Sequence, residues 1–153
     1  MGRIAVRDPA VRRGLALAGL TRHHLGILRT WRRVCEAALD VIVDELLPRD
    51  HRLTAERPRS CLRELASTML AGRVDDAYVA ARRHAGQGCH HGGGLDDGGA
   101  LAMYETVRRV FVLAVRGAGA DPEAQATFEE ALGRLIQIDV ALLVTGTPLM
   151  APV

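Results

Sequence analysis

Apolar residues recur every three or four positions along most of this 153-residue chain, and this spacing constrains the fold more than any other feature. It is the period of a helix that buries one face. Between these segments, no stretch alternates apolar and polar residues as a half-buried strand would. The sequence therefore predicts an all-α protein of about six to eight helices, expected at 9–20, 22–47, 60–73, 74–86, 100–119 and 123–147.

Several residues are of the kinds that start and stop helices. Thr21 is expected to cap the second segment, and Gly72 is expected to end the third. Asp121 and Pro122 form a cap-and-start pair for the last one. The second segment is long, so we expect a break near Trp31 to Val34, and a polar connector is expected at 49–59. The predicted buried stripes are Leu25, Leu28, Val34, Ala38, Val41 and Leu46; Leu62, Leu65, Met69 and Leu70; and Leu101, Tyr104, Val107, Phe111 and Ala114.

Composition limits the class of protein. Aromatic residues make up only 3% of the chain, so the core must be built from Leu, Val, Ala and Ile. The net charge of +2 is small, and the arginines alternate with acidic residues, which argues against a nucleic-acid partner. No run is long enough to cross a membrane, and no signal peptide is recognisable. Three cysteines without CxxC spacing fit reduced thiols, so we expect a cytoplasmic protein.

A glycine-rich stretch, "GQGCHHGGGLDDGG" at 86–99, separates two helical segments and carries Cys89, His90 and His91. Imidazole is a good ligand for zinc, copper and iron, including haem iron. Three adjacent ligands are too crowded to surround a tetrahedral zinc ion, whereas a haem needs a single axial histidine. Haem, another metal and an inert connection therefore stay open on these residues alone. The other histidines, His23, His24, His51 and His84, are expected at the surface.

The whole chain, taken in order, resembles the globin domain of the globin-coupled sensor and protoglobin family over roughly residues 14–145. Four stretches carry the resemblance: "RGLALAGLTRHHLGILRTWRRVCEAALDVIVDELL", "LASTMLAGRVDDAYVAARRHAG", "HHGGGLDDGGALAMYETVRRVF" and "LIQIDVALLV". Members typically show a Gly-Leu-Thr step, a Gly-Arg-x-Asp-x-x-Tyr-Val stretch, the proximal histidine, a Gly-Leu pair and a later tyrosine. These features fall here at Gly19-Leu20-Thr21, 72–79, His90, Gly94-Leu95 and Tyr104.

The resemblance implies a globin-like fold that binds haem b (iron protoporphyrin IX) with His90 as the axial ligand. Counting back from Gly94-Leu95 and Tyr104 selects His90. Counting forward from Tyr78 selects Cys89 unless one residue is inserted, and His91 is the second choice.

Further cofactor contacts are implied on both sides of the haem. The distal face would carry Leu47, Leu65 and Met69, all apolar, and Leu47 stands where the family usually has a tyrosine that donates a hydrogen bond to bound gas. Arg82 or Arg83 would pair with a haem propionate. Tyr78 and Tyr104 are candidate cofactor contacts, although their helical spacing also suits the core.

The expected organisation is an N-terminal extension at 1–13, a globin-like haem-binding domain at 14–147 and a tail at 148–153. Three functions stay open: a globin that binds O2, CO or NO, a haem-dependent enzyme of oxidative or nitrogen-transfer chemistry, and a haem-free signalling module. Relatives dimerise through their last two helices, which implies a homodimer through the apolar "VFVLAV" and "IDVALLV" runs. We expect no output domain after the last helix, so that any signal would leave through a partner protein or the dimer face.

Overall fold

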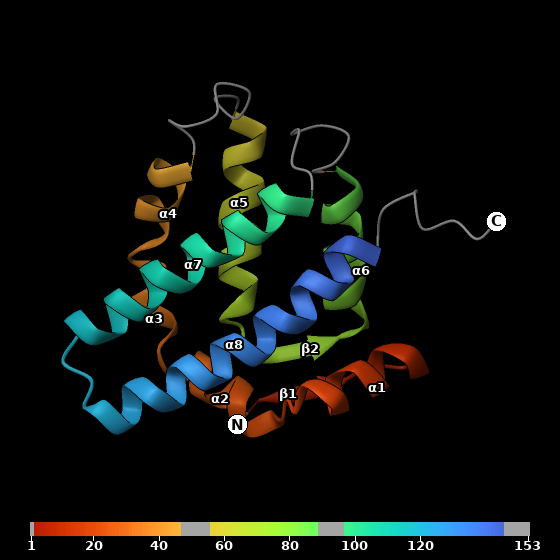
Figure 1. Cartoon of the computed structure of the whole chain (residues 1–153), viewed down its shortest axis with the longest axis horizontal. Helices are drawn as coiled ribbons and strands as arrows, with labels where there is room; N and C mark the ends of the chain where they lie inside the picture. The colour runs from red at the N-terminus through yellow and green to blue at the C-terminus, as the bar shows by residue number, and fades with distance from the viewer. Residues whose placement is uncertain (1, 47–55, 89–96, 146–153) are drawn as a thin grey trace.

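The computed structural model describes residues 2–46, 56–88 and 97–145, and within these ranges the chain forms eight α-helices and one pair of short strands (Figure 1). The all-α prediction is confirmed. In chain order the elements are β1 (Arg3–Ala5), α1 (Pro9–Ala18), α2 (Arg22–Thr30), α3 (Arg32–Glu36), α4 (Leu39–Leu46), α5 (Glu56–Met69), β2 (Arg73–Asp75), α6 (Asp76–Gly88), α7 (Asp97–Gly117) and α8 (Pro122–Thr145).

The helix α8 is the element on which most of the fold is assembled. It packs along α7 and also contacts α1, α2 and α6, while α4 packs against α5 and α7 on the other side of the molecule (Figure 1). These helices enclose one apolar core, in which Leu28, Phe111, Phe128 and Leu132 are completely buried. The first 13 residues, expected as an extension of the domain, contribute Val6 and Val11 to this core.

The predicted helix caps are present. The Asp121 carboxylate accepts a hydrogen bond from the backbone N–H of Ala124 (2.7 Å) at the start of α8. At the start of α2 the caps are reciprocal: Thr21 Oγ1 accepts from the His24 N–H (3.4 Å), and His24 Nδ1 accepts from the Thr21 N–H (3.0 Å). Partial burial, and then the nearby Arg134, lower the pKa of His24, which keeps its ring neutral and able to accept at pH 7. His24 thus replaces the usual Glu or Gln of a capping box.

The long segment that starts at Arg22 breaks where expected and once more. α2 ends at Thr30 with Trp31 as its C-cap, within the predicted break, and a second break at Ala37 and Ala38 separates α3 from α4. Each break rotates the following helix about its axis, so one continuous stripe cannot describe all three helices. The prediction that Val41 is buried was therefore wrong: it is 51% exposed, and Leu39 and Ile42 take the core positions of α4.

Other predicted boundaries and contacts were also wrong. α5 begins at Glu56, so part of the polar connector expected at 49–59 is helical, with Pro58 in the first turn, where a missing N–H is tolerated. α6 runs through Gly88 and α7 starts at Asp97, so the glycines at both ends of the 86–99 stretch lie in helices. Leu101 near the start of α7 was expected in the core and is 56% exposed.

A two-stranded parallel sheet, β1 with β2, was not predicted. Arg3 pairs with Arg73, Ile4 with Val74 and Ala5 with Asp75. Strands of three residues are too short for an alternating pattern to be recognised in sequence. Gly72, predicted to end the preceding helix, has a φ of +77° and turns the chain from α5 into β2. The sheet therefore fixes the point at which α6 begins.

We predict that Thr21→Ala lowers the free energy of unfolding by about 1 kcal/mol, because the first turn of α2 loses its side-chain cap. Urea denaturation followed by circular dichroism measures the change. The matched control is Thr127→Ala in the second turn of α8, where the hydroxyl bonds only to the Glu123 carbonyl of its own helix and alanine is the better helix former. Equal destabilisation by both substitutions would contradict a capping role for Thr21.

Candidate functional site

A buried carboxylate, Asp139, lies in the middle of α8 and is fully shielded from solvent. Its Oδ2 accepts a hydrogen bond from Arg82 Nε of α6 (2.9 Å) and another from the Tyr104 hydroxyl of α7 (3.1 Å). Its Oδ1 accepts from the Tyr78 hydroxyl of α6 (2.5 Å). Asp139 thus links α6, α7 and α8 through three donors. We call Asp139, Arg82, Tyr78 and Tyr104 the Asp139 cluster.

Arg82 connects the Asp139 cluster to a fourth helix. Its Nη2 donates to the Leu65 carbonyl oxygen of α5 (3.0 Å) and to the Tyr78 hydroxyl oxygen (3.0 Å). Its guanidinium carbon also lies 4.2 Å from the centre of the Tyr78 ring, which is close enough for a cation–π contact. Because Arg82 is only 2% exposed, its charge has no water to solvate it and depends on these partners.

The protonation states in the Asp139 cluster follow from burial and from the central charge pair. Burial raises the pKa of Tyr78 and of Tyr104, and the neighbouring Asp139 raises both further, so both hydroxyls stay protonated and donate. Burial alone would lower the pKa of Arg82, but Asp139, Tyr78 and Tyr104 together outweigh burial, and the pKa of Arg82 lies above its ordinary value. Every buried side-chain nitrogen and oxygen in the described part of the chain has a hydrogen-bond partner. The cluster is therefore a structural network in which every buried polar side-chain atom is hydrogen-bonded.

The structure brings together five of the residues that the sequence singled out. Tyr78, Arg82 and Tyr104 belong to the Asp139 cluster, Leu65 accepts from Arg82 through its carbonyl, and Met69 is buried one helical turn further along α5. Arg83 instead lies half-buried at the surface, where it meets the Asp8 carboxylate at 3.4 Å. Leu47, Cys89, His90 and His91 lie outside the described residues.

Sequence reasoning missed Asp139 itself. Asp139 could have been recognised from the sequence, because it is the one acidic residue within the apolar run "LIQIDVALLV". It also lies four positions after the buried Leu135 and three before the buried Leu142, on the face of α8 that turns to the core. An acidic residue on a core-facing position predicts a buried partner, because an unpaired buried carboxylate is very unfavourable.

Other candidate chemistry in the described residues is limited. No group of three or more His, Cys, Asp and Glu side chains in this part of the chain could hold a metal ion. Cys35 is buried, and burial raises the pKa of its thiol to about 12, so it is an unreactive core residue. No helix in the described ranges is both long and apolar enough to cross a membrane.

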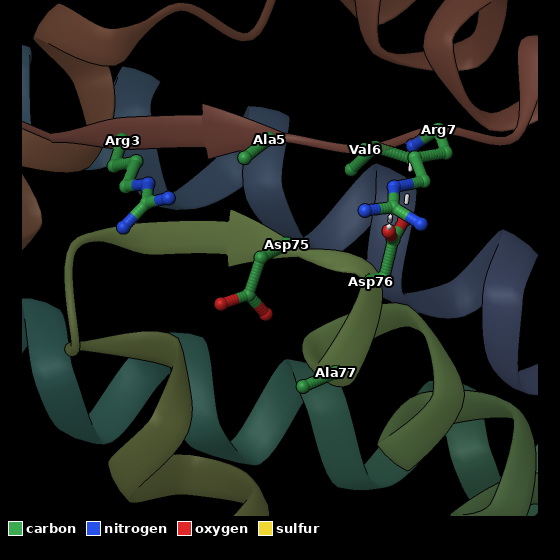
Figure 2. Close-up of a pocket in the computed structure, with 7 residues that line it drawn as sticks. All are labelled: Arg3, Ala5, Val6, Arg7, Asp75, Asp76 and Ala77. Carbon is green, nitrogen blue, oxygen red and sulfur yellow. Dashed lines mark hydrogen bonds and ion pairs between the residues drawn. The ribbon is translucent and has the colours of Figure 1, made fainter.

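Two surface cavities flank the strand pair. The first, of about 500 Å3, is lined by residues of β1, β2 and the start of α6, and Figure 2 shows them. Arg7 lies over Asp76 in this view: its backbone N–H donates to the carboxylate at 2.9 Å, and its guanidinium approaches at 3.6 Å. Two arginines and two aspartates line this cavity, so its charges balance. The second, of about 540 Å3, lies between α2, α3, the end of α5 and the strands.

The apolar runs expected to form a dimer interface are mostly used within one chain. Val110, Phe111, Val112 and Val115 of α7 are buried in the core, and so are Leu142 and Leu143 of α8. On the outer face of α7, Leu113 is 53% exposed and Leu101 is similarly open. The homodimer stays a prediction, resting on a smaller apolar surface than the sequence indicated.

The arrangement of helices is that of a globin. No protein-family profile matches the chain, and no curated protein sequence matches it. Among solved structures, the globin domain of the Geobacter sulfurreducens globin-coupled sensor superposes with a TM-score of 0.76, covering 88% of this chain and 95% of that one. The two sequences are 15% identical, so the similarity is one of fold. The fold implied by the sequence resemblance is thereby confirmed.

We predict that Asp139→Leu lowers the free energy of unfolding by about 3–5 kcal/mol, because it leaves the buried Arg82 charge without its counterion. The double variant Arg82→Met/Asp139→Leu is expected to regain most of that loss, since no buried charge remains. Urea unfolding measures both. The matched control, Arg108→Met, removes the exposed partner of Glu105 and should cost less than about 1 kcal/mol. A double variant no more stable than Asp139→Leu would show that the two residues are not coupled.

Proposed function

We propose that the protein is a haem-binding globin that binds a small diatomic ligand, O2, CO or NO, with His90 as the axial ligand of iron. The observation that carries the proposal is the globin arrangement of helices over 88% of the chain. It is joined by a histidine that follows α6 after one intervening residue. In the sequence, His90 lies eight positions after Arg82, which is buried in the core.

The donor set of the chain fits a haem better than a bare metal ion. A structural zinc site needs four ligands, and the described residues bring no three candidate ligands together. A haem takes one axial histidine from the protein and otherwise needs apolar walls. The core supplies such walls in Leu65, Met69 and Phe111. The buried charges near them, Arg82 and Asp139, already neutralise each other.

Arg82 and Arg83 were both expected to pair with a haem propionate, but their contacts in the structure differ. Arg82 already donates hydrogen bonds to Asp139, Leu65 and Tyr78. If Arg82 moved to a propionate, the buried carboxylate of Asp139 would lose its counterion. Arg83 has a 41% exposed side chain, and its ion pair among the described residues is a long contact with Asp8, which it can exchange for another partner at little cost in free energy. We therefore propose Arg83 for this role.

The distal side is proposed to be apolar, built from Leu47, Leu65 and Met69. Such a site offers a bound diatomic ligand no hydrogen bond, whereas a donor near a ligand that carries partial charge stabilises it. Weak preference for O2 over CO follows from this composition. A haem with an apolar, accessible distal side would also support the oxidative or nitrogen-transfer chemistry left open by the sequence. Homodimerisation through α7 and α8, or docking of a signalling partner there, would carry any response.

We predict that the purified protein titrates with hemin to one equivalent and develops a Soret absorption band, which shifts on reduction and on addition of CO. His90→Ala should lose the band or change its position, because the axial imidazole is gone. His23→Ala, an exposed histidine at the start of α2, is the matched control and should leave the spectrum unchanged.

Two further variants, His91→Ala and Cys89→Ala, test the register of the axial ligand and should also leave the spectrum unchanged. Circular dichroism of each variant checks that the fold is intact. If the folded protein stays colourless after hemin is added, the proposal is overturned. The remaining function would then be a haem-free signalling module.

A second prediction concerns the distal side. Leu47→Tyr adds a hydrogen-bond donor, and a hydrogen bond to a charged group contributes about 1.5–3 kcal/mol. The O2 affinity relative to the CO affinity should therefore rise by about tenfold to a hundredfold. Flash photolysis measures both affinities. The control Leu47→Phe adds the ring without the hydroxyl and should not raise the ratio. An equal effect of both variants would mean that position 47 acts through volume alone.

A further inference from the structure

We propose that the 540 Å3 cavity bounded by Arg3, Arg29, Arg32 and Arg73 binds a phosphate-bearing small molecule. The remaining lining residues, Ser67, Thr68, Ala71 and Gly72, come from the end of α5 and the turn that follows it. The four arginines reach the cavity from four different elements: β1, α2, α3 and β2. Segments far apart in the sequence therefore converge with one sign of charge.

The charges around this cavity do not balance. Arg32 is paired with Glu36 (2.8 Å), and Arg73 approaches Asp75 only at 3.8 Å. Arg3 and Arg29 have no carboxylate partner among the described residues. Arg3 also lines the neighbouring cavity in Figure 2, where Arg7 is paired with Asp76, but Arg3 itself forms no ion pair with Asp75 or Asp76.

The arrangement of the arginines is unfavourable without an anion. Arg3 and Arg73 are directly paired across the two strands and line the same cavity, so two like charges stand opposite each other. Like charges at facing positions of a sheet destabilise it. Arg29 is held close to this pair because its side chain crosses Gly72, where a Cβ atom would come within 2.9 Å of Arg29 Cβ. A bound anion would remove the repulsion that this geometry creates.

Phosphate is the anion that this chemistry fits best. Guanidinium groups are planar, permanently charged and able to donate two parallel hydrogen bonds to phosphate oxygens. Four of them around one cavity can contact more than one phosphate group. The volume lies within the range of about 300–1,000 Å3 that is usual for small-ligand sites. Pyrophosphate, tripolyphosphate and nucleoside di- and triphosphates share the recognised chemistry.

The single tryptophan provides a probe for the test. Trp31 lies between Arg29 and Arg32 in the sequence, at the junction of α2 and α3. Titration of the full chain with tripolyphosphate, which does not absorb at the excitation wavelength, should change Trp31 fluorescence saturably. Calorimetry gives the stoichiometry, expected to be one per chain, and affinity should fall as salt is raised.

The decisive comparison uses two variants with the same loss of charge. Arg3→Gln/Arg29→Gln should weaken tripolyphosphate binding at least tenfold. Arg12→Gln/Arg13→Gln, on the exposed face of α1, should weaken it less than twofold. Circular dichroism shows that both are folded. Equal weakening by the two double variants, or no saturable binding at 50 mM salt (about a 14 Å screening length), would overturn the proposal.

Two additional probes identify the source of the phosphate. Tighter binding of a nucleoside diphosphate than of pyrophosphate, measured by calorimetry, would assign the cavity to organic phosphates. Equal binding would assign it to inorganic polyphosphates. Both measurements use protein prepared without added hemin, so they are independent of the haem proposal.

Discussion

The contact between Arg82 and Asp139 joins the four helices that make up most of the core. Arg82 reaches α5 through the Leu65 carbonyl and α8 through Asp139, and Tyr104 brings in α7. In a core of aliphatic side chains, packing alone permits small sliding of one helix over another. A buried pair with directional hydrogen bonds permits only the register in which all its partners meet. We therefore assign this cluster the role of fixing helix register, a specificity role that buried polar groups have in other folds.

Features of this structure that depend on residues close together in the sequence could be predicted, whereas features that depend on distant residues could not. Local signals were read correctly: Thr21 caps α2, Asp121 caps α8 and Trp31 interrupts the first long helical segment. The exposure of Val41 was predicted wrongly, because the second break, at Ala37 and Ala38, changes which face of α4 is buried. The local sequence was not recognised as breaking the helix there. The strand pair joins residues 70 positions apart with only three residues on each side. Such a contact is decided by tertiary packing and leaves no periodic trace.

The candidate site was anticipated in the same uneven way. Tyr78, Arg82 and Tyr104 were singled out as residues that a cofactor could contact, and the structure shows them in contact with one another around Asp139. The sequence gives the type of each residue but not its partner, and Arg82 looks like one of many surface arginines until Asp139 is placed beside it. The cavity between β1, α2, α3 and β2 could not be predicted at all, because it requires four arginines from separate elements to converge.

The arginine cavity lies close to the start of α6, and the Asp139 cluster holds the middle of that helix through Arg82. The start of α6 follows directly from β2, which carries Arg73, while its end at Gly88 is two residues before His90. A helix of 13 residues is about 20 Å long, and Arg82 is midway along it. Sliding of α6 along its axis would have to break the Arg82–Asp139 pair and expose each charge to an apolar core. A ligand at the arginine cavity is therefore not expected to move α6 as a rigid rod. The arginine cavity is also lined by Ser67 and Thr68 of α5, which directly precede Met69 in the sequence. Because we propose Met69 for the distal side of a haem, α5 is the more direct connection between the two proposed sites.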